Sequence, residues 1–564
     1  MTSGNHRPES QIRSSNEWQP ADRVEDLACR LVRIPSETGT ADEENFAQGL
    51  VDILMEIPYF RENPTDIRVA DGLGSSKAQN VVAVVRGAGR NSLLLAGHYD
   101  TVSIENYHDL KDLSREPYTL NEALISDLSS RALSDQEDKA LRDLKSGDFL
   151  PGRGMLDMKS GLAAGIAVLE RFANQEDRQG NLVLCCSPDE ERDSRGMRAL
   201  RDWMPQLMDE LQLDPVGAIN MDVTSDQGDG SEGRAAYAGT IGKLMPFALV
   251  IGQSSHASYP YEGVSAQLIA AEVIRRVEAN AELSDHTPEA ISPPPICLEA
   301  RDLRDVYEVT TPERTWLAFN WLYHSWSPEE LFKRFQAEVG SAVQSAVARI
   351  ADNARSYVKR SGGTDWPDTA EARIMTYAEL KREASRRLGD RFQGALEAKQ
   401  HELQAIDNPL SVSRELTNWL VAQAHVSGPV VIVGFASLHY PATRLDLEHA
   451  DDAALHNAIS ETLSGYEAER SRRVKWRPYF EGISDMSFFG QPGKATSSVV
   501  ADNTPPAWLI DRPNETAMRC PMVNIGPWGR EFHQRLERVY KPYAFDELPR
   551  ILAEIGDRLL GNRE

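Results

Sequence analysis

The first part of the chain alternates short apolar runs with longer amphipathic stretches. Four runs have the length and composition of buried strands, at residues 80–86, 92–96, 182–187 and 217–222. Four stretches have the apolar spacing of helices, at residues 22–33, 43–55, 160–172 and 194–211. Strands that alternate with helices predict an α/β sandwich with a mainly parallel sheet. Binding sites in such sheets form at the carboxyl ends of the strands.

A second pattern begins after the polar, glycine-rich stretch Ser225–Arg234, which we predict to be a linker. The apolar runs beyond it predict strand, helix, two strands, helix and strand, at residues 244–251, 263–280, 306–311, 315–323, 328–358 and 373–377. This order is typical of a small α+β domain of ferredoxin-like arrangement. The apolar run Pro429–Phe435 is predicted to return the chain to the first sheet. Residues 103–148, which are charged and mixed, predict a surface insertion.

Composition narrows the classes of partner and compartment. The chain has 564 residues and a net charge of −25. This charge argues against a nucleic-acid partner, because binding phosphates needs clustered Lys and Arg. No apolar run is long enough to span a membrane, and the first residues lack the apolar core of a secretory signal. The five cysteines show no CxxC spacing, so we predict a cytoplasmic protein with free thiols.

Candidate chemistry gathers at the ends of the predicted strands. The residues concerned are His98, Asp100, Asp157, Glu190, Glu191, Asp222 and, near the end of the chain, His533. Asp157 stands just before a predicted helix, and His533 follows the run Asn524–Phe532. Imidazole nitrogens and carboxylate oxygens are ligands that zinc accepts in catalytic sites. The set suits two divalent metals bridged by one carboxylate.

Each of these residues also has an ordinary structural interpretation. An aspartate before a helix, such as Asp157, is usually an N-cap, and one at a strand end, such as Asp222, is usually a turn residue. A histidine such as His98 or His533 is more often structural or at the surface, and adjacent glutamates usually lie in solvent. All of these interpretations would have to hold together for the metal prediction to be wrong.

With these motifs the chain resembles the di-zinc metallopeptidases that include aminoacylases, glutamate carboxypeptidases, succinyl-diaminopimelate desuccinylases and bacterial dipeptidases. The segments Tyr237–Pro246 and Asp305–Pro312 are similar to the arginine-utilisation, RocB-like branch of that family. The resemblance implies that Asp157 bridges two metals, with His98 and Asp222 on one and Glu191 and His533 on the other. The metals would be zinc, with cobalt or manganese as alternatives. It also implies a cis peptide between Asp157 and Met158.

The resemblance assigns three further roles. Glu190 would be the general base, and Asp100 would orient the ring of His98. His256, in Gly252–Gly263, resembles a lid histidine that reaches across a dimer to the substrate carbonyl oxygen; the alternative is a polar turn. One feature departs from the family: Thr315–His324 lacks the lid arginine that many members use to hold a substrate carboxylate.

The resemblance thus implies a metal-dependent hydrolase that cleaves an amide or peptide bond of a small amino-acid-derived substrate, in arginine or amino-acid catabolism. A homodimer through the lid is expected. The alternative is a non-catalytic binding or assembly protein with the same fold. The predicted segments are a disordered lead-in at 1–20, a catalytic domain at 21–235 and 381–564, and a lid at 236–380.

Overall fold

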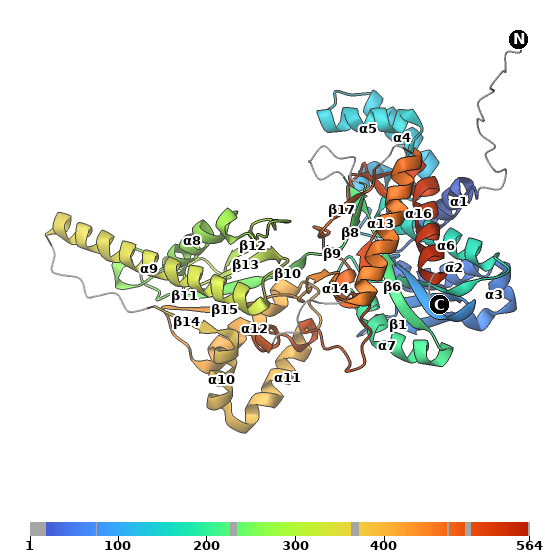
Figure 1. Cartoon of the computed structure of the whole chain (residues 1–564). Helices are drawn as coiled ribbons and strands as arrows, with labels where there is room; N and C mark the ends of the chain where they lie inside the picture. Colours follow the sequence, from blue (N-terminus) through green and yellow to red (C-terminus); the bar gives the residue numbers. More distant parts are fainter. Residues whose placement is uncertain are drawn as a thin grey trace, which may run out of the picture.

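Two sheets of different build organise the chain. The computed structural model describes residues 18–74, 76–225, 234–362, 372–470, 473–490 and 498–561. The predicted lead-in up to residue 17 and most of the predicted linker lie outside these residues. Figure 1 shows the first sheet with its helices on the right and the second, elongated part on the left.

The first sheet has eight strands, parallel in its middle. Their order is β1 (Ile67–Asp71), β2 (Gln79–Val85), β5 (Gln179–Ser187), β3 (Ala88–His98), β6 (Asp214–Asn220), β18 (Met522–Asn524), β8 (Ala235–Tyr237) and β17 (Lys475–Arg477). The pairs β5–β3, β3–β6 and β6–β18 are parallel, whereas β1 and β2 run antiparallel at one edge. The predicted α/β class is confirmed, and the carboxyl ends of the central strands meet at one edge.

Helices cover both faces of this sheet because alternate side chains of each strand point to opposite faces. Leu93 and Leu95 of β3 pack in one core, and Leu94 and Ala96 pack in another. The first core is closed by α1 (Ala21–Arg33), α2 (Ala41–Leu54), α6 (Ser160–Ala173), α13 (Ala450–Arg470) and α16 (Leu548–Gly561). The second core is closed by α7 (Arg195–Leu211) and α14 (Met486–Phe489). Among the described helices, none is both long enough and apolar enough to cross a membrane.

The second sheet forms the lid. Its path is β10 (Gly242–Leu244), β13 (Arg314–Tyr323), β11 (Pro246–Ile251), β15 (Val430–Phe435) and β14 (Arg373–Thr376), and β12 (Ile296–Asp302) pairs with β13. The helices α8 (Ala266–Val277) and α9 (Pro328–Ser361) cover one face. The helices α10 (Tyr377–Leu388), α11 (Phe392–Leu403) and α12 (Pro409–Ala424) cover the other. The predicted order of strands and helices in the lid is present.

Two predictions about the lid were wrong. The run Pro429–Phe435 does not return to the first sheet, because β15 pairs with β11 and β14. The strand predicted at 306–311 is found instead at Ile296–Asp302, where β12 pairs with β13. Since α10 to α12 also pack on the lid sheet, we propose that the boundary predicted at residue 380 lies after β15.

Three smaller features complete the fold. Two of the segments that pass between the lid and the first part lie side by side, because β9 (Gly239–Thr240) pairs with β16 (Thr443–Arg444). A small sheet consists of β4 (Phe149–Pro151), β20 (Arg538–Tyr540), β19 (Trp528–Arg530) and β7 (Thr224–Ser225). Residues 105–146 form a short helical segment, Glu105–Leu113, followed by α4 (Pro117–Ser129) and α5 (Asp135–Ser146), which share their own small apolar core.

Candidate metal centre

The predicted site residues come together at the carboxyl edge of the first sheet. His98 is the last residue of β3, and Asp222 follows the end of β6 by two residues. The register of these parallel strands pairs Ala96 with Asn220. Two residues further along, His98 and Asp222 therefore lie side by side.

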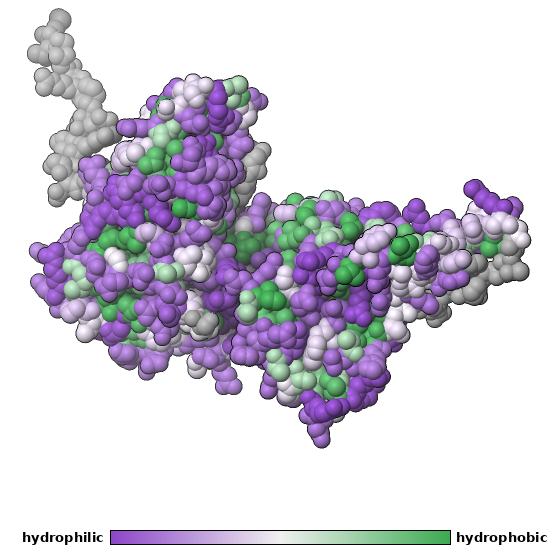
Figure 2. Space-filling model, turned by 180° about the vertical axis from the view of Figure 1, so that it is seen from behind, coloured by the Kyte–Doolittle hydropathy of each residue, from purple (hydrophilic) through white to green (hydrophobic). Residues whose placement is uncertain are grey.

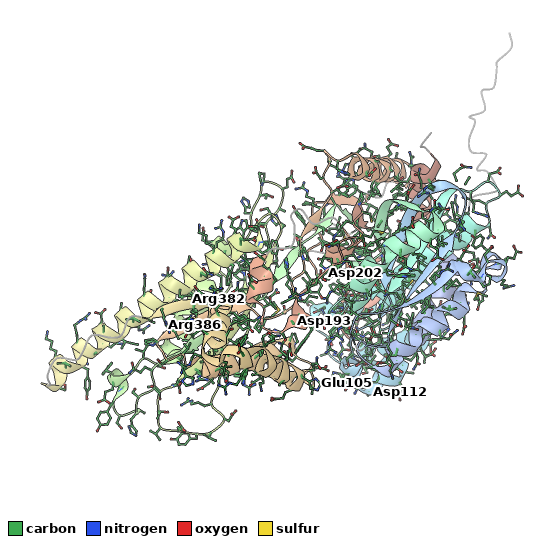
Figure 3. All side chains as sticks on the ribbon, turned by 90° about the horizontal axis from the view of Figure 1, so that it is seen from below. Glu105, Asp112, Asp193, Asp202, Arg382 and Arg386 are labelled. Carbon is green, nitrogen blue, oxygen red and sulfur yellow. The ribbon has the colours of Figure 1, made fainter. Side chains whose placement is uncertain are left out.

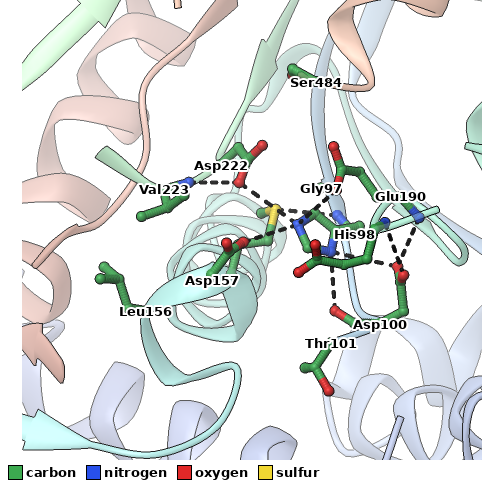
Figure 4. A network of polar contacts seen from close by, with 12 residues as sticks. Gly97, His98, Asp100, Thr101, Leu156, Asp157, Glu190, Asp222, Val223 and Ser484 are labelled. Carbon is green, nitrogen blue, oxygen red and sulfur yellow. Dashed lines mark hydrogen bonds and ion pairs between the residues drawn. The ribbon is translucent and has the colours of Figure 1, made fainter. Parts of the chain in front are cut away.

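His98 faces two carboxylates with the same ring nitrogen. Its Nε2 lies 3.2 Å from Asp157 Oδ1 and 3.7 Å from Asp222 Oδ1, and Figure 4 shows these side chains converging. Its Nδ1 lies 3.1 Å from the Asp100 carbonyl oxygen and 3.5 Å from the carboxylate Oδ1 of the same residue. Asp100 therefore holds the Nδ1 proton, so Nε2 is the ring nitrogen that could bind a metal once it has lost its own proton.

A second group lies on the other side of Asp157. His533 Nε2 is 2.9 Å from Asp157 Oδ2 and 2.9 Å from Glu191 Oε1. The two oxygens of one carboxylate thus face two different histidines. Ligand atoms within each of the groups His98–Asp157–Asp222 and Asp157–Glu191–His533 lie within 4.8 Å of one another. The expected cis peptide between Asp157 and Met158 is present.

The carboxylate of Asp100 anchors the turn that carries Glu190 and Glu191. The Asp100 carboxylate accepts hydrogen bonds from the backbone N–H of Glu190, at 3.1 Å, and of Glu191, at 3.2 Å. It also accepts one from the Thr38 hydroxyl, at 2.9 Å. The Glu190 carboxylate lies 3.9 Å from His98 Nε2 and belongs to neither ligand group. Asp100 therefore connects the His98 ring to the turn that carries both glutamates.

Burial and close packing of charge shift the protonation of the site. Burial raises the pKa of Glu190 well above its usual range, and the nearby carboxylates of Asp222, Asp485 and Glu191 add to this effect. Burial alone would lower the pKa of His98, but hydrogen bonds to Asp100, Asp157 and Asp222 raise it well above the usual value. Burial alone would also lower the pKa of His533, but hydrogen bonds to Asp157 and Glu191 raise it to about 11. The imidazoles thus hold protons that a metal ion would have to displace.

An ion pair that the sequence did not predict connects the two ligand loops. Arg153 Nη1 donates to Glu537 Oε2 at 2.6 Å, and both side chains are buried. The other oxygen of Glu537 accepts from the backbone N–H of Asp157, at 3.4 Å. Arg153 Nη2 lies 3.4 Å from the carbonyl oxygen of His533, which also accepts from Asn106 Nδ2 at 2.9 Å.

The site opens into a cavity of about 490 Å³. Residues of both ligand groups line it together with Lys243 and Tyr440, two residues that the sequence analysis did not select. Asp485, buried behind the site, accepts a hydrogen bond from Ser187 at 2.9 Å. His256 is not among the residues that line this cavity; it is exposed in the lid, where its Nδ1 accepts a hydrogen bond from the backbone N–H of Ser258 at 3.1 Å.

The fold and this donor set define a two-part α/β protein with a candidate centre for two metal ions. The chain belongs to peptidase family M20/M25/M40, whose model matches residues 132–507. Membership implies a metal-dependent hydrolase that acts on peptide or amide bonds.

Two relatives match over nearly the whole length. The chain is 28% identical to the uncharacterized protein YqjN of Bacillus subtilis over 555 residues, which cover 97% of this chain and 98% of YqjN. It is 29% identical to the protein RocB of the same organism over 556 residues, which cover 96% and 95% of the two chains. The aminopeptidase PepT of Bacillus cereus has a similar fold, with a TM-score of 0.51 at 13% identity over 96% of this chain and 99% of PepT.

Proposed function

We propose that this protein hydrolyses an amide or peptide bond of a small amino-acid-derived substrate at a centre of two divalent metal ions. One observation carries the proposal. The Oδ1 of Asp157 faces His98, and its Oδ2 faces His533. A carboxylate between two nitrogen ligands has the arrangement that a bridging ligand needs. His98 and Asp222 would complete one metal, and Glu191 and His533 the other.

The donors present suit zinc. Each group offers one imidazole nitrogen and carboxylate oxygens, a set that zinc, cobalt and manganese accept, whereas magnesium and calcium favour oxygen ligands alone. We propose zinc as the native metal. Bound there, two such ions would supply Lewis acidity that polarises a substrate carbonyl and makes water more acidic.

Glu190 is placed to move the protons of the reaction. It is adjacent in sequence to a proposed ligand, but its carboxylate lies outside both ligand groups and lines the cavity. Its carboxylate lies 3.9 Å from His98 Nε2 and faces the cavity, where it could take a proton from water and return it to the leaving nitrogen. We therefore propose Glu190 as the general base.

The variant Glu190→Gln tests this proposal. It keeps the size of the side chain and removes the base, so turnover should fall by about 10² or more while the metal content stays unchanged. The screen would offer acyl-amino acids, dipeptides and arginine-derived amides, with elemental analysis of the metal in parallel. The exposed Glu329→Gln on α9 is the control. Loss of metal from Glu190→Gln would show that Glu190, and not Glu191, is the ligand.

The alternative is a binding or assembly protein with this fold and no turnover. It would bind metal and yet release no product from any substrate in the screen.

The similarity to RocB supports a proposed place in arginine or amino-acid catabolism. The five cysteines are all free, which supports the predicted reducing, cytoplasmic compartment.

His256 is proposed to act from a partner subunit. It lies in the lid, and β12 nearby is bonded to β13 and to no other strand among the described residues. Hydrophobic side chains are exposed there: Ile296 at 39%, Leu298 at 56% and Tyr307 at 91%. Figure 2 shows hydrophobic residues gathered on the exposed surface of the lid. An open strand edge with apolar side chains can pair with a second copy of the chain.

Mixing two inactive variants tests this role. His256→Ala should lower kcat by about 10² to 10³ and leave metal binding intact, because an oxyanion donor is lost. Hybrid dimers of His256→Ala and Glu190→Gln chains would contain one site with both residues, so some activity should return. No recovery after confirmed subunit exchange would contradict action across a dimer.

A further inference from the structure

A lysine of the lid faces the cavity of the metal centre. Lys243 lies in β10, the first strand of the lid sheet, and its backbone pairs with Tyr440: Lys243 N donates to Tyr440 O at 2.8 Å, and Tyr440 N donates to Lys243 O at 3.1 Å. Both residues stand next to the segments that join the lid to the first part. Lys243 nevertheless lines the same cavity as Glu190 and Asp222.

The ammonium group of Lys243 is held without an ion pair among the described residues. Its Nζ lies over the ring of Tyr440, 4.5 Å from the centroid. A ring face attracts a cation but accepts no strong hydrogen bond, so the donors of the ammonium group stay available to a ligand. The Tyr440 ring is itself fixed, because its hydroxyl donates to the carbonyl oxygen of Arg192 at 3.2 Å.

The electrostatic environment of Lys243 is set by burial and by carboxylates around the cavity. Burial lowers the pKa of Lys243, and the carboxylates of Glu190 and Asp193 oppose that shift. Figure 3 places Asp193 where the lid and the first part meet. Two other basic residues line the cavity, and both are engaged elsewhere: Arg192 Nη2 donates to Asp407 at 2.8 Å, and His533 faces Asp157 and Glu191.

The rest of the cavity limits the size and nature of the ligand. Its volume of about 490 Å³ is within the range of small-molecule sites. Phe480, Ile483 and Phe532 supply apolar surface to the same lining. A cation beside an apolar wall matches a small molecule that carries both a negative group and a hydrocarbon part.

We propose that Lys243 forms an anion subsite of this cavity and that the substrate is a small amide or dipeptide with a free carboxylate near the scissile bond. The proposal rests on the proposed hydrolase function and names its substrate class. The ammonium group donates to the substrate carboxylate and so fixes the position of the scissile bond beside Glu190. Lys243 is thus a specificity-determining residue, placed on the hinge side of the lid.

Binding should depend on the metals as well as on Lys243. Five carboxylates among the described residues line the cavity and repel an anion: Asp157, Glu190, Glu191 and Asp222 at the metal centre, and Glu481. Two divalent ions would balance the charge of the four at the metal centre, so that an anion would meet the ammonium group of Lys243 with far less repulsion. Carboxylate binding is therefore expected only in metal-loaded protein.

Calorimetry with paired ligands tests the proposal directly. Zinc-loaded Glu190→Gln protein, chosen to prevent turnover, would be titrated with N-acetyl-leucine, N-acetyl-glutamate, N-acetyl-arginine and glycyl-leucine, and with the carboxamide of each. At least one carboxylate should bind about tenfold to a hundredfold more tightly than its carboxamide, as expected for a charge-assisted hydrogen bond. Adding Lys243→Gln should remove the difference, and Lys243→Arg should keep part of it. The exposed Lys333→Gln on α9 is the control.

The outcomes separate this inference from the proposed function. Equal binding of acid and amide, a preference that survives Lys243→Gln, or no binding of any ligand in the panel overturns the inference. Unchanged metal content in Lys243→Gln, measured by elemental analysis, shows that the site itself has formed. If the active protein releases no product while the Lys243-dependent preference is present, the hydrolase proposal fails and the anion subsite stands.

Discussion

The two halves of the candidate metal centre are built in different ways. His98 and Asp222 stand at the ends of neighbouring parallel strands, and the His98 side chain is only 1% exposed. His533 stands in the loop between β19 and β20, its side chain is 41% exposed, and its φ is 64°. The register of the sheet places the first pair. The loop histidine depends on contacts made from outside its own element.

Those contacts come from two distant segments. The carbonyl oxygen of His533 accepts hydrogen bonds from Asn106, in the insertion, and from Arg153, in the turn before Asp157. The buried Arg153–Glu537 pair ties that turn to the segment after His533. The insertion therefore does more than cover the surface, because it helps to position a proposed ligand. Strand-end ligands should tolerate loss of a neighbour better than the loop ligand does.

The largest effect is expected where the two halves meet. Asp157→Asn should weaken the binding of both metals by more than about a hundredfold. Loss of a residue that only hydrogen-bonds to a ligand already lowers metal affinity by about tenfold to a hundredfold, and this change removes a shared ligand. Metal affinity would be measured by competition with a chelator. The exposed Asp135→Asn on α5 is the control. Loss of one metal with the other unaffected would contradict a bridging role.

A smaller and one-sided effect is expected from Glu537→Gln. The substitution weakens the ion pair with Arg153, but the Gln side chain keeps an oxygen that can accept from the backbone N–H of Asp157. Binding of the metal held by His533 should therefore weaken by about tenfold to a hundredfold, and binding of the other metal should not. Stepwise calorimetric titration distinguishes the two sites, with the exposed Glu554→Gln as the control. An equal loss at both sites would mean that the two halves are not built independently.

The smallest expected effect is the release of protons when metal binds. The pKa of His533 is raised to about 11 and that of His98 lies well above its usual value, so both rings hold a proton at pH 7 while no metal is bound. Metal binding should release these protons, and metal affinity should fall as the pH is lowered, by about tenfold per pH unit for each proton released. Calorimetry in buffers of different ionisation enthalpy counts the protons. The His533→Ala protein should release fewer protons when it binds metal. An unchanged number of released protons would contradict a protonated His533.

The contrast between the halves also explains what the sequence could predict. His98 and Asp222 follow apolar strands, and a parallel sheet brings its carboxyl ends together. The position of His533 came from resemblance, since nothing local in a late loop points to a particular partner. Lys243 and the Arg153–Glu537 pair were missed because their contacts join residues far apart in the chain.

The errors in the lid have the same physical origin. Val430–Phe435 is apolar throughout and buried, so its pattern cannot tell which sheet it joins. β12 exposes the apolar residues Ile296, Leu298 and Ala300 at alternate positions along an open edge, whereas the apolar residues Val306 and Val309 lie exposed in a loop. Periodicity predicts that a strand exists more reliably than it predicts its neighbours.

A crystal structure of zinc-loaded protein, with anomalous scattering at the zinc edge, tests the two-metal centre bridged by Asp157 most directly. We expect two peaks roughly 3.5 to 4 Å apart. Asp157 should contact both, His98 and Asp222 should contact one, and Glu191 and His533 should contact the other, with Glu190 bound to neither. A single peak, or two peaks with Glu190 as a ligand and Asp157 on only one, would contradict the account.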